Sequence, residues 1–292
     1  MAACKQGQNC IVSEEAILGE NVVLGHHVII EKGAVIGDKS YIDSNTIIRS
    51  GVVLGANTFL GSNCIIGEYQ MDFCQSREDC GHKLIIGDNA LIRSGTIIYT
   101  GSNIGDYFQC GHQVTIRENA CIGSHVSIGT LSDIQGNCEI GSYVRLHSNV
   151  HIGQLSQIDN FVWIYPYVVL TNDPTPPSEY FAGAKVCSFA VIATGAVIMP
   201  GIEIGIDSLV AAGAIVTKDV SMYCVAAGNP AKPISNVRNI KNKISGEPAY
   251  PWREHFDRYM PWENVGFHTW YHSLSLQEKC LYKLEWMEEQ KD

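Results

Sequence analysis

A period of six residues runs through most of this chain of 292 residues, and it constrains the fold more than any other feature. From Ile86 to Leu170 every sixth residue is aliphatic or cysteine, and the next residue is often glycine. A helix repeats every 3.6 residues and an open strand every two, so neither explains this spacing. A period of six is typical of a parallel β-helix, in which each hexad supplies one short strand and one turn.

The period also predicts which residues lie inside. Alternate residues of a short strand point to opposite faces, so each sixth residue and the residue two before it point into the coil. Three hexads make one triangular coil, and residues three hexads apart lie roughly 4.8 Å apart in neighbouring coils. The same period holds from Val12 to Ile66 and from Ile192 to Val216. The thirty hexads together predict an all-β solenoid of about ten coils.

Two interruptions and a different C-terminal composition divide the chain. Residues 68–83 are polar, and residues 171–187 contain several prolines, so we expect both to be external loops of the solenoid. The period stops after Val220, and GNPAKPI at residues 228–234 reads as a turn. We therefore predict a β-helix domain over residues 10–220 and a helical, aromatic-rich cap over residues 235–292, with an amphipathic helix after Ser273.

Composition restricts the partners. The net charge of −10 argues against a nucleic-acid backbone as a partner. The eleven cysteines form no CxxC pair, which favours core thiols in a reducing compartment over metal or disulfide roles. No apolar run approaches membrane length and residues 1–10 lack an apolar signal region, so we expect a cytoplasmic protein without a membrane partner.

Three features together resemble a known family. Hexads run through the chain, a proline-bearing loop begins with TND, and the repeat ends with GAIVTKDV followed by VAAGNPAKPI. This combination resembles the hexapeptide-repeat acyltransferases, and within them the branch that N-acylates nucleotide-linked amino sugars. The resemblance covers about residues 10–235. It implies a left-handed coil, a homotrimer with active sites between neighbouring prisms, coenzyme A (acyl-CoA) as co-substrate and no metal, and a nucleotide-linked (dTDP or UDP) amino deoxysugar of polysaccharide biosynthesis as acceptor.

The candidate general base is His112. In related acyltransferases the catalytic histidine stands four residues before an inward aliphatic residue, as His112 stands before Ile116. The five coils from Cys110 to Val210 span roughly 24 Å, which is comparable with an extended pantetheine arm. The alternatives are a surface or interface role for His112, and a reaction in which the departing thiolate accepts the proton.

The spacing of three hexads between neighbouring coils gives a rival pair for the role of general base. Asp133 and His151 are three hexads apart and both point outward, so we expect them to be neighbours in adjacent coils. The carboxylate would then orient the imidazole. A solvated or interfacial ion pair is the plainer interpretation.

Other site candidates follow from the resemblance and from charge. For the acceptor we select Asn172 and Asp173, because an aspartate pairs with a protonated amine, although both residue types also make turns before proline. Arg117 and Arg77 are candidates for the nucleotide diphosphate. For coenzyme A the candidates lie near the C-terminal end of the repeat: Ala212, Gly213, Lys218, Gly228 and Lys232.

The sequence is also compatible with three other functions, and it predicts an assembly. O-acetyl transfer to a sugar or other small hydroxyl acceptor, a carbonic-anhydrase-like metalloenzyme and a non-catalytic trimeric scaffold are the alternatives. No two histidines of the solenoid have the five-residue spacing of such zinc ligands. One outward aliphatic row predicts a parallel homotrimer, and it comprises Ile11, Ile17, Val23, Ile29 and Val35.

Overall fold

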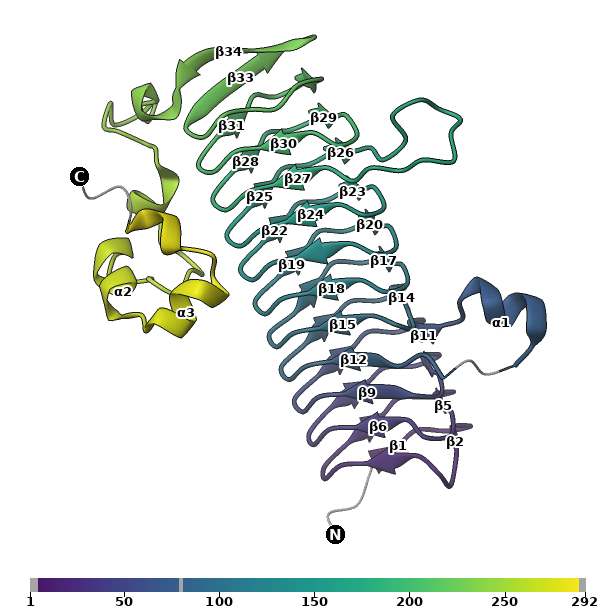
Figure 1. The fold of residues 1–292 in the computed structure, drawn as a ribbon. Coiled ribbons are helices and arrows are strands. Elements are labelled where there is room, and N and C mark those ends of the chain that lie inside the picture. Colours follow the sequence, from purple (N-terminus) through teal and green to yellow (C-terminus); the bar gives the residue numbers. More distant parts are fainter. Residues whose placement is uncertain (1–4, 79–80, 289–292) are drawn as a thin grey trace.

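The computed structural model describes residues 5–78 and 81–288 as a triangular prism of parallel strands with a helical segment beside it (Figure 1). Three sheets of parallel strands, which we call A, B and C, form the prism, and the chain visits them in this order in every coil except the last. Successive strands of one sheet are three hexads apart in most coils, as in the pairing of Asp133 with His151. The predicted parallel β-helix is confirmed.

The strands are mostly two residues long, because each hexad turns a corner immediately after its strand. Sheet A contains β1 (Lys5–Gln6), β4 (Val23–Leu24), β7 (Tyr41–Ile42), β10 (Phe59–Leu60), β13 (Leu91–Ile92), β16 (Gln109–Cys110), β19 (Ser127–Ile128), β22 (Arg145–Leu146), β25 (Trp163–Ile164), β28 (Val191–Ile192), β31 (Leu209–Val210), β33 (Cys224–Gly228) and β34 (Ala231–Asn236).

Sheet B contains β2 (Ile11–Val12), β5 (Ile29–Ile30), β8 (Ile47–Ile48), β11 (Ile65–Glu68), β14 (Ile97–Tyr99), β17 (Thr115–Ile116), β20 (Asp133–Ile134), β23 (His151–Ile152), β26 (Val169–Leu170), β29 (Val197–Ile198) and β32 (Ile215–Val216). Sheet C contains β3 (Ile17–Leu18), β6 (Val35–Ile36), β9 (Val52–Leu54), β12 (Leu84–Ile86), β15 (Asn103–Ile104), β18 (Cys121–Ile122), β21 (Glu139–Ile140), β24 (Gln157–Ile158), β27 (Lys185–Val186) and β30 (Glu203–Ile204).

The stack is longer than the ten coils that the hexads predict, since sheet B has 11 strands and sheet A has 13, of which the last two form a hairpin. β1 lies before the first of the thirty predicted hexads. Val186, within the stretch expected to be the second loop, is the inward residue of one further hexad. The GNPAKPI stretch is also more than a turn. It forms the end of the β33–β34 hairpin, which extends sheet A and contains a cis Asn229–Pro230 bond.

The core is a continuous column of aliphatic side chains along the prism axis. Each inward residue stacks on its counterpart in the next coil, for example Ile116 on Ile134. Cys64, Cys110 and Cys138 are buried in this column, whereas Cys10 packs against its open N-terminal end and is half-buried. Burial raises the pKa of Cys110 to about 12, which keeps this thiol protonated and unreactive.

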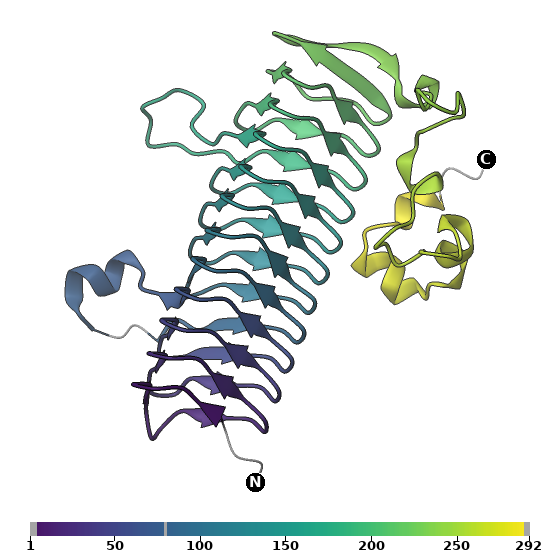
Figure 2. The same ribbon diagram turned by 180° about the vertical axis from the view of Figure 1, so that it is seen from behind.

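Both interruptions of the repeat leave the prism at the same corner, which follows sheet B (Figures 1 and 2). The first contains the helix α1 (Met71–Ser76), and the second is an extended loop between β26 and β27. The C-terminal segment, residues 237–288, lies on a different side of the prism in both views. The two interruptions, which we call the first and second excursions, therefore lie on a different surface of the prism from the C-terminal segment.

The C-terminal segment contains only short helices: η1 (Val237–Asn239), η2 (Trp252–Glu254), α2 (Phe267–Ser273), α3 (Leu276–Leu281) and η3 (Glu285–Met287). A single amphipathic helix after Ser273 was expected, but α3 begins at the capping box of Ser275 and Glu278 and ends after six residues. Aromatic side chains from the whole C-terminal segment, including Trp252, Trp262 and Trp270, pack against Phe161 and Phe189 on the side of the prism.

Those two phenylalanines belong to an aromatic ladder at the corner between sheets C and A. Tyr107, His125, Tyr143, Phe161 and Phe189 stack in sequence, with ring centroids 4.5–5.4 Å apart. All five have φ between 56° and 63°, a left-handed conformation that non-glycine residues rarely adopt. Stacking along the ladder offsets that cost. Tyr143, Phe161 and Phe189 also pack against the C-terminal segment, so this part of the corner is its docking line.

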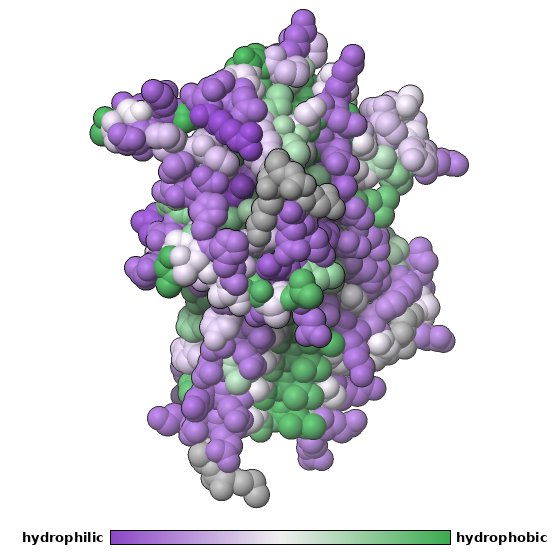
Figure 3. All heavy atoms as spheres, turned by 60° about the vertical axis from the view of Figure 1, so that its left-hand side comes forward, coloured by the Kyte–Doolittle hydropathy of each residue, from purple (hydrophilic) through white to green (hydrophobic). Residues whose placement is uncertain are grey.

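The outward aliphatic row is not one row. The five residues alternate between the three sheets, because a column advances by three hexads and not by one. The true columns are Ile11, Ile29, Ile47, Ile65 and Ile97 on sheet B, and Ile17, Val35, Val53 and Ile85 on sheet C. Figure 3 shows an apolar patch near the N-terminal end of the prism.

Candidate functional site

Sheet B and the corners on either side of it carry most of the candidate residues. We call the turns that lead from sheet A to sheet B the A–B corner, and those from sheet B to sheet C the B–C corner. His112 and Ala212 occupy equivalent positions of the A–B corner, in one column with Thr130, Ser148, Pro166 and Thr194. Arg117 and Lys218 lie at the B–C corner.

His112 is exposed at the A–B corner, two residues after β16. Its backbone N–H donates to Thr130 Oγ1 over 3.2 Å, and its carbonyl accepts from the Leu131 N–H over 3.0 Å. These bonds fix the backbone of His112 while the imidazole remains accessible. Gly213, which is next to Ala212 in the same corner, has φ of 69° and nothing within 4 Å of where a Cβ would stand, so its backbone is open to a ligand.

The rival pair is formed as the column spacing predicts. His151 Nδ1 lies 3.1 Å from Asp133 Oδ2 on the outer surface of sheet B. Gln135 Nε2 donates to the same oxygen over 2.7 Å. Burial alone would raise the pKa of Asp133, but the hydrogen bonds from His151 and Gln135 outweigh it and the pKa lies below its ordinary value. When Asp133 is ionised and accepts a hydrogen bond from Nδ1–H of His151, Nε2 is the ring nitrogen that can take a proton from a substrate.

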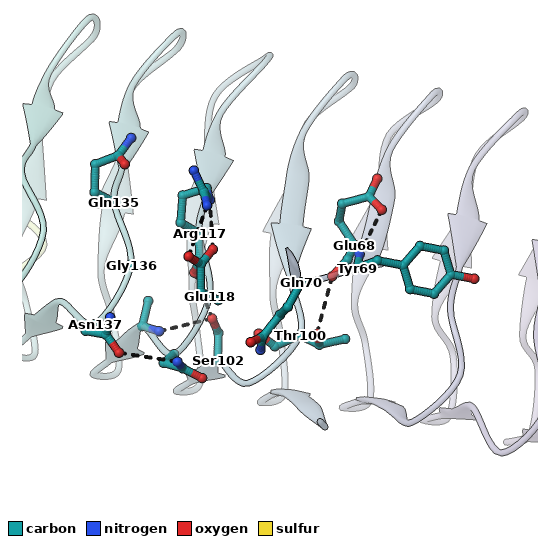
Figure 4. Close-up of polar contacts among 12 residues, drawn as sticks. Glu68, Tyr69, Gln70, Thr100, Ser102, Arg117, Glu118, Gln135, Gly136 and Asn137 are labelled. Atoms are coloured by element: carbon teal, nitrogen blue, oxygen red, sulfur yellow. Dashed lines mark hydrogen bonds and ion pairs between the residues drawn. The ribbon is translucent and has the colours of Figure 1, made fainter. Parts of the chain in front are cut away.

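Figure 4 shows the polar stretch of the B–C corner, next to Gln70 at the start of the first excursion. Arg117 faces Glu118, with Nε–Oε2 and Nη2–Oε1 distances of 2.7 and 3.0 Å, and its guanidinium lies 5.0 Å from the Tyr99 ring. Gln70, at the foot of the first excursion, donates to the carbonyl of Thr100. Arg117 is therefore already paired within the chain and less available for a diphosphate than its sequence position suggests.

The acceptor candidates lie in the second excursion, and their own loop occupies them. Asp173 accepts from the Ser178 hydroxyl over 2.7 Å and from the backbone N–H groups of Thr175 and Ser178 over 3.0 Å. The Ser178 hydroxyl chiefly, together with these backbone donors, lowers the pKa of Asp173. The Asn172 carbonyl accepts from the Ala182 N–H over 2.8 Å, which closes the base of the loop. This is the turn-making role that was the alternative for both residues.

The remaining candidates are spread out. Arg77 ends α1 and lines a groove of about 580 Å³ between this helix and the first coils of sheet B. Gly228 and Lys232 lie in the terminal hairpin, and Lys218 and Lys232 are both exposed. No group of three or more His, Cys, Asp or Glu side chains in residues 5–78 and 81–288 has an arrangement that could hold a metal ion. No helix in the same residues is long and apolar enough to cross a bilayer.

Comparison with family models matches the repeat itself. The model described as bacterial transferase hexapeptide (six repeats) matches residues 33–68, and that described as hexapeptide repeat of succinyl-transferase matches residues 15–50 and 193–218. The repeats in these segments are therefore of the hexapeptide type that the two models describe. The second match includes the corner of Ala212 and Gly213 and ends at Lys218.

Curated relatives match short parts of the chain. A 2,3,4,5-tetrahydropyridine-2,6-dicarboxylate N-acetyltransferase of Staphylococcus aureus is 47% identical over 57 residues, which is 18% of this chain and 24% of that protein. A chloramphenicol acetyltransferase of Klebsiella aerogenes is 33% identical over 75 residues, 24% of this chain and 36% of that protein. The chain thus spans about a quarter to a third of the length of these relatives.

Comparison with solved structures gives matches of low similarity. The LpxA UDP-N-acetylglucosamine acyltransferase of Bacteroides fragilis is 21% identical, with 78% of this chain and 73% of that chain covered and a TM-score of 0.39. PerB of Caulobacter crescentus, solved with CoA and GDP-perosamine, is 19% identical, with 62% and 71% covered and a TM-score of 0.25.

The aromatic ladder was missed at the sequence level, although a signal exists. Tyr107, His125, Tyr143 and Phe161 follow one another at intervals of three hexads. Reading the corner positions as columns, and not only the inward positions, finds this set.

Proposed function

We propose that the protein is an acyl-CoA-dependent N-acyltransferase that acylates the amine of a nucleotide-linked amino deoxysugar. The observation that carries this proposal is the alignment of His112 with Ala212 in one column of the A–B corner. Five coil steps separate the two residues, roughly 24 Å. A donor lying along this corner has its nucleotide end near Gly213 and its thioester near His112, where a base is needed.

The chemistry at this corner follows from the position of His112. The amine attacks the thioester carbonyl, the imidazole takes the proton of the amine, and the thiolate of coenzyme A leaves. The similarity of short segments to acetyltransferases supports acyl transfer as the reaction class. Lys218 and Lys232, which are both exposed near the C-terminal end, are available for the phosphates of the donor.

A parallel homotrimer is part of this proposal. In a closed ring each copy uses two different surfaces, one for each neighbour. The aliphatic columns of sheets B and C provide two such surfaces in the N-terminal coils, and Ile11 and Ile17 are 65% and 61% exposed.

The pair of His151 and Asp133 favours a second candidate, O-acyl transfer to a hydroxyl. A hydroxyl needs a stronger base than an amine does, and a carboxylate-oriented imidazole is such a base. The relevant difference between the two candidates is therefore which histidine is required.

The test uses purified protein with acetyl-CoA or a longer acyl-CoA and a panel of dTDP- and UDP-linked amino sugars. Release of free thiol measures turnover, and mass spectrometry locates the new acyl group. Each amino sugar has a matched control that carries a hydroxyl in place of the amine. Turnover with the amine only supports N-acylation, turnover with the hydroxyl supports the second candidate, and no thiol release with any acceptor contradicts both.

A further inference from the structure

A cleft between sheet A and the C-terminal segment is lined mainly by aromatic rings. Its volume is about 380 Å³, at the lower end of the usual range for small-ligand sites of roughly 300–1,000 Å³. The lining residues come from the prism and from the segment: His147, Trp163, Tyr165, Val191, Ala249, Tyr250, Trp252, Phe256 and Arg258. Neither the candidate residues of sheet B nor those of the terminal hairpin belong to this set.

Some of the lining rings meet edge to face, whereas others stack. Trp163 meets Trp252 at 77° and Phe256 at 89°, with ring centroids 5.9 and 5.6 Å apart. His147 stacks on Tyr165 at 4.6 Å. The indole N–H of Trp163 is buried without a hydrogen-bond partner among the residues that the structure describes. A polar group that is buried without a partner costs free energy, which a ligand acceptor would recover.

Two arginines converge beside the cleft. Arg145 is the neighbour of Trp163 in sheet A, and Arg258 lines the cleft. Their guanidinium carbons lie 5.7 and 5.4 Å from the centroid of the same ring, that of Tyr259. Arg145 Nη2 donates to the Tyr259 carbonyl over 3.3 Å. Burial lowers the pKa of Arg145, whose Nε is buried without a hydrogen-bond partner in residues 5–78 and 81–288.

The acids beside these arginines are engaged elsewhere. Glu263 accepts from the backbone N–H of Tyr259, and Asp257 accepts from that of Asn264. No salt bridge of Arg145 or Arg258 is present within the part of the chain that the structure describes. An anion placed near these two guanidinium groups therefore gains Coulomb attraction.

The charges exclude one common occupant of aromatic cages. Quaternary ammonium ligands bind to rings by cation–π attraction. Here the positive charges of Arg145 and Arg258 already oppose a cation, and the lining contains no Asp or Glu. Burial lowers the pKa of His147, so its imidazole is neutral near pH 7 and adds no further positive charge.

We propose that this cleft binds the nucleoside phosphate part of a ligand, with the base against the aromatic rings and a phosphate at Arg145 and Arg258. Rings that accept a base and guanidinium groups that accept a phosphate are the two recognition elements of such a ligand. A nucleotide-linked sugar and coenzyme A both carry this chemistry. The inference goes beyond the proposed function, because nucleotide binding here does not require acyl transfer.

The test measures binding of UDP, dTDP, ADP, coenzyme A, uridine and inorganic phosphate to the full chain. Trp163 and Trp252 line the cleft, so tryptophan fluorescence and calorimetry both report occupancy. We expect a diphosphate to bind at least about tenfold more tightly than uridine or phosphate alone. Preference for UDP and dTDP over ADP and coenzyme A assigns the cleft to the acceptor. Preference for coenzyme A over ADP would assign it to the donor and would move the nucleotide end of the donor here from Gly213.

Two variants locate the ligand. Phe256→Ala removes a stacking surface and Arg258→Gln removes a charge, and each should weaken nucleotide binding about tenfold or more. Matched controls are Phe59→Ala, which removes a ring that stacks on Tyr41, and Arg238→Gln, which removes a guanidinium that lies over Tyr223. Unchanged affinity in both cleft variants, or no nucleotide binding by the unaltered chain, overturns the inference. Thiol release in the acyltransferase assay is a separate readout, so the two proposals fail independently.

Discussion

Arg253 of the C-terminal segment forms an ion pair with Asp207 of the prism, and both side chains are at most 5% exposed. Asp207 occupies the corner position that follows Phe189 in the column of the aromatic ladder. The Arg253 guanidinium also lies 5.0 Å from the Phe189 ring. This pair joins the segment to the prism at the end of the ladder.

Replacing Arg253 by Met should weaken the docking of the segment more at neutral than at acidic pH. Burial raises the pKa of Asp207 to about 6 against the opposing effect of Arg253, and loss of Arg253 raises it further. The pKa of Asp207 is higher in the folded state than its unfolded-state value of about 3.9. Its contribution to the free energy of unfolding is therefore fully present below that pKa and is lost as pH rises through the folded-state pKa. Breaking a buried ion pair costs about 3–5 kcal/mol.

Thermal unfolding at pH 5 and pH 7.5 checks this expectation. The double variant Arg253→Met/Asp207→Asn should regain most of the loss at pH 7.5, because it leaves no buried charge. An equal loss of stability at both pH values in the single variant would contradict the role assigned to Asp207.

The two histidines of the sheet B region should separate N-acyl from O-acyl transfer. If His112 is the base, His112→Asn lowers kcat by roughly 10²–10⁴-fold and His151→Asn has little effect. The loss in His112→Asn should shrink at high pH, where more of the amine is neutral. Steady-state kinetics over a range of pH measure this, with coenzyme A binding as the control for folding. A large loss of kcat in His151→Asn alone would show that His151, oriented by Asp133, is the general base instead.

Deletion of residues 246–292 should leave the prism folded but expose an apolar strip. The aliphatic core inside the coils shares no residue with the aromatic cluster outside, so each coil keeps its internal contacts. Phe161, Phe189 and Val191 then lose their cover and attract apolar dyes. Circular dichroism reports the first expectation and dye fluorescence the second. Loss of the β-sheet signal would show that the segment is required for the prism.

A charge on the exposed aliphatic column of sheet C should dissociate the proposed trimer. Ile17→Glu places a carboxylate in this column without touching the inward residues of β3. Gln157→Glu is the matched control, since it adds a carboxylate to the polar part of the same sheet. Light scattering at micromolar concentration should give a trimer for the control and a monomer for Ile17→Glu. A monomer for the unaltered chain would refute the assembly.

The inward positions were predictable because the chain meets the same constraint every six residues. Ile116, Ile134 and Ile152 each point into the coil, and the pairing of Asp133 with His151 follows from the same spacing. The excursions and the C-terminal segment follow no period. Their structures depend on contacts distant in sequence, such as Asp207 with Arg253. The hydrogen bonds that occupy Asp173 and the pairing of Arg117 with Glu118 likewise need side-chain geometry that spacing alone does not supply.

The hairpin of β33 and β34 has a consequence for growth of the stack. A sheet of parallel strands offers unpaired N–H and C=O groups at its last strand, and these groups invite another chain to continue it. In sheet A the antiparallel β34 takes that place, and it contains Pro233, which has no N–H to donate. Continuation of sheet A by a strand of another chain is therefore disfavoured at this end of the prism.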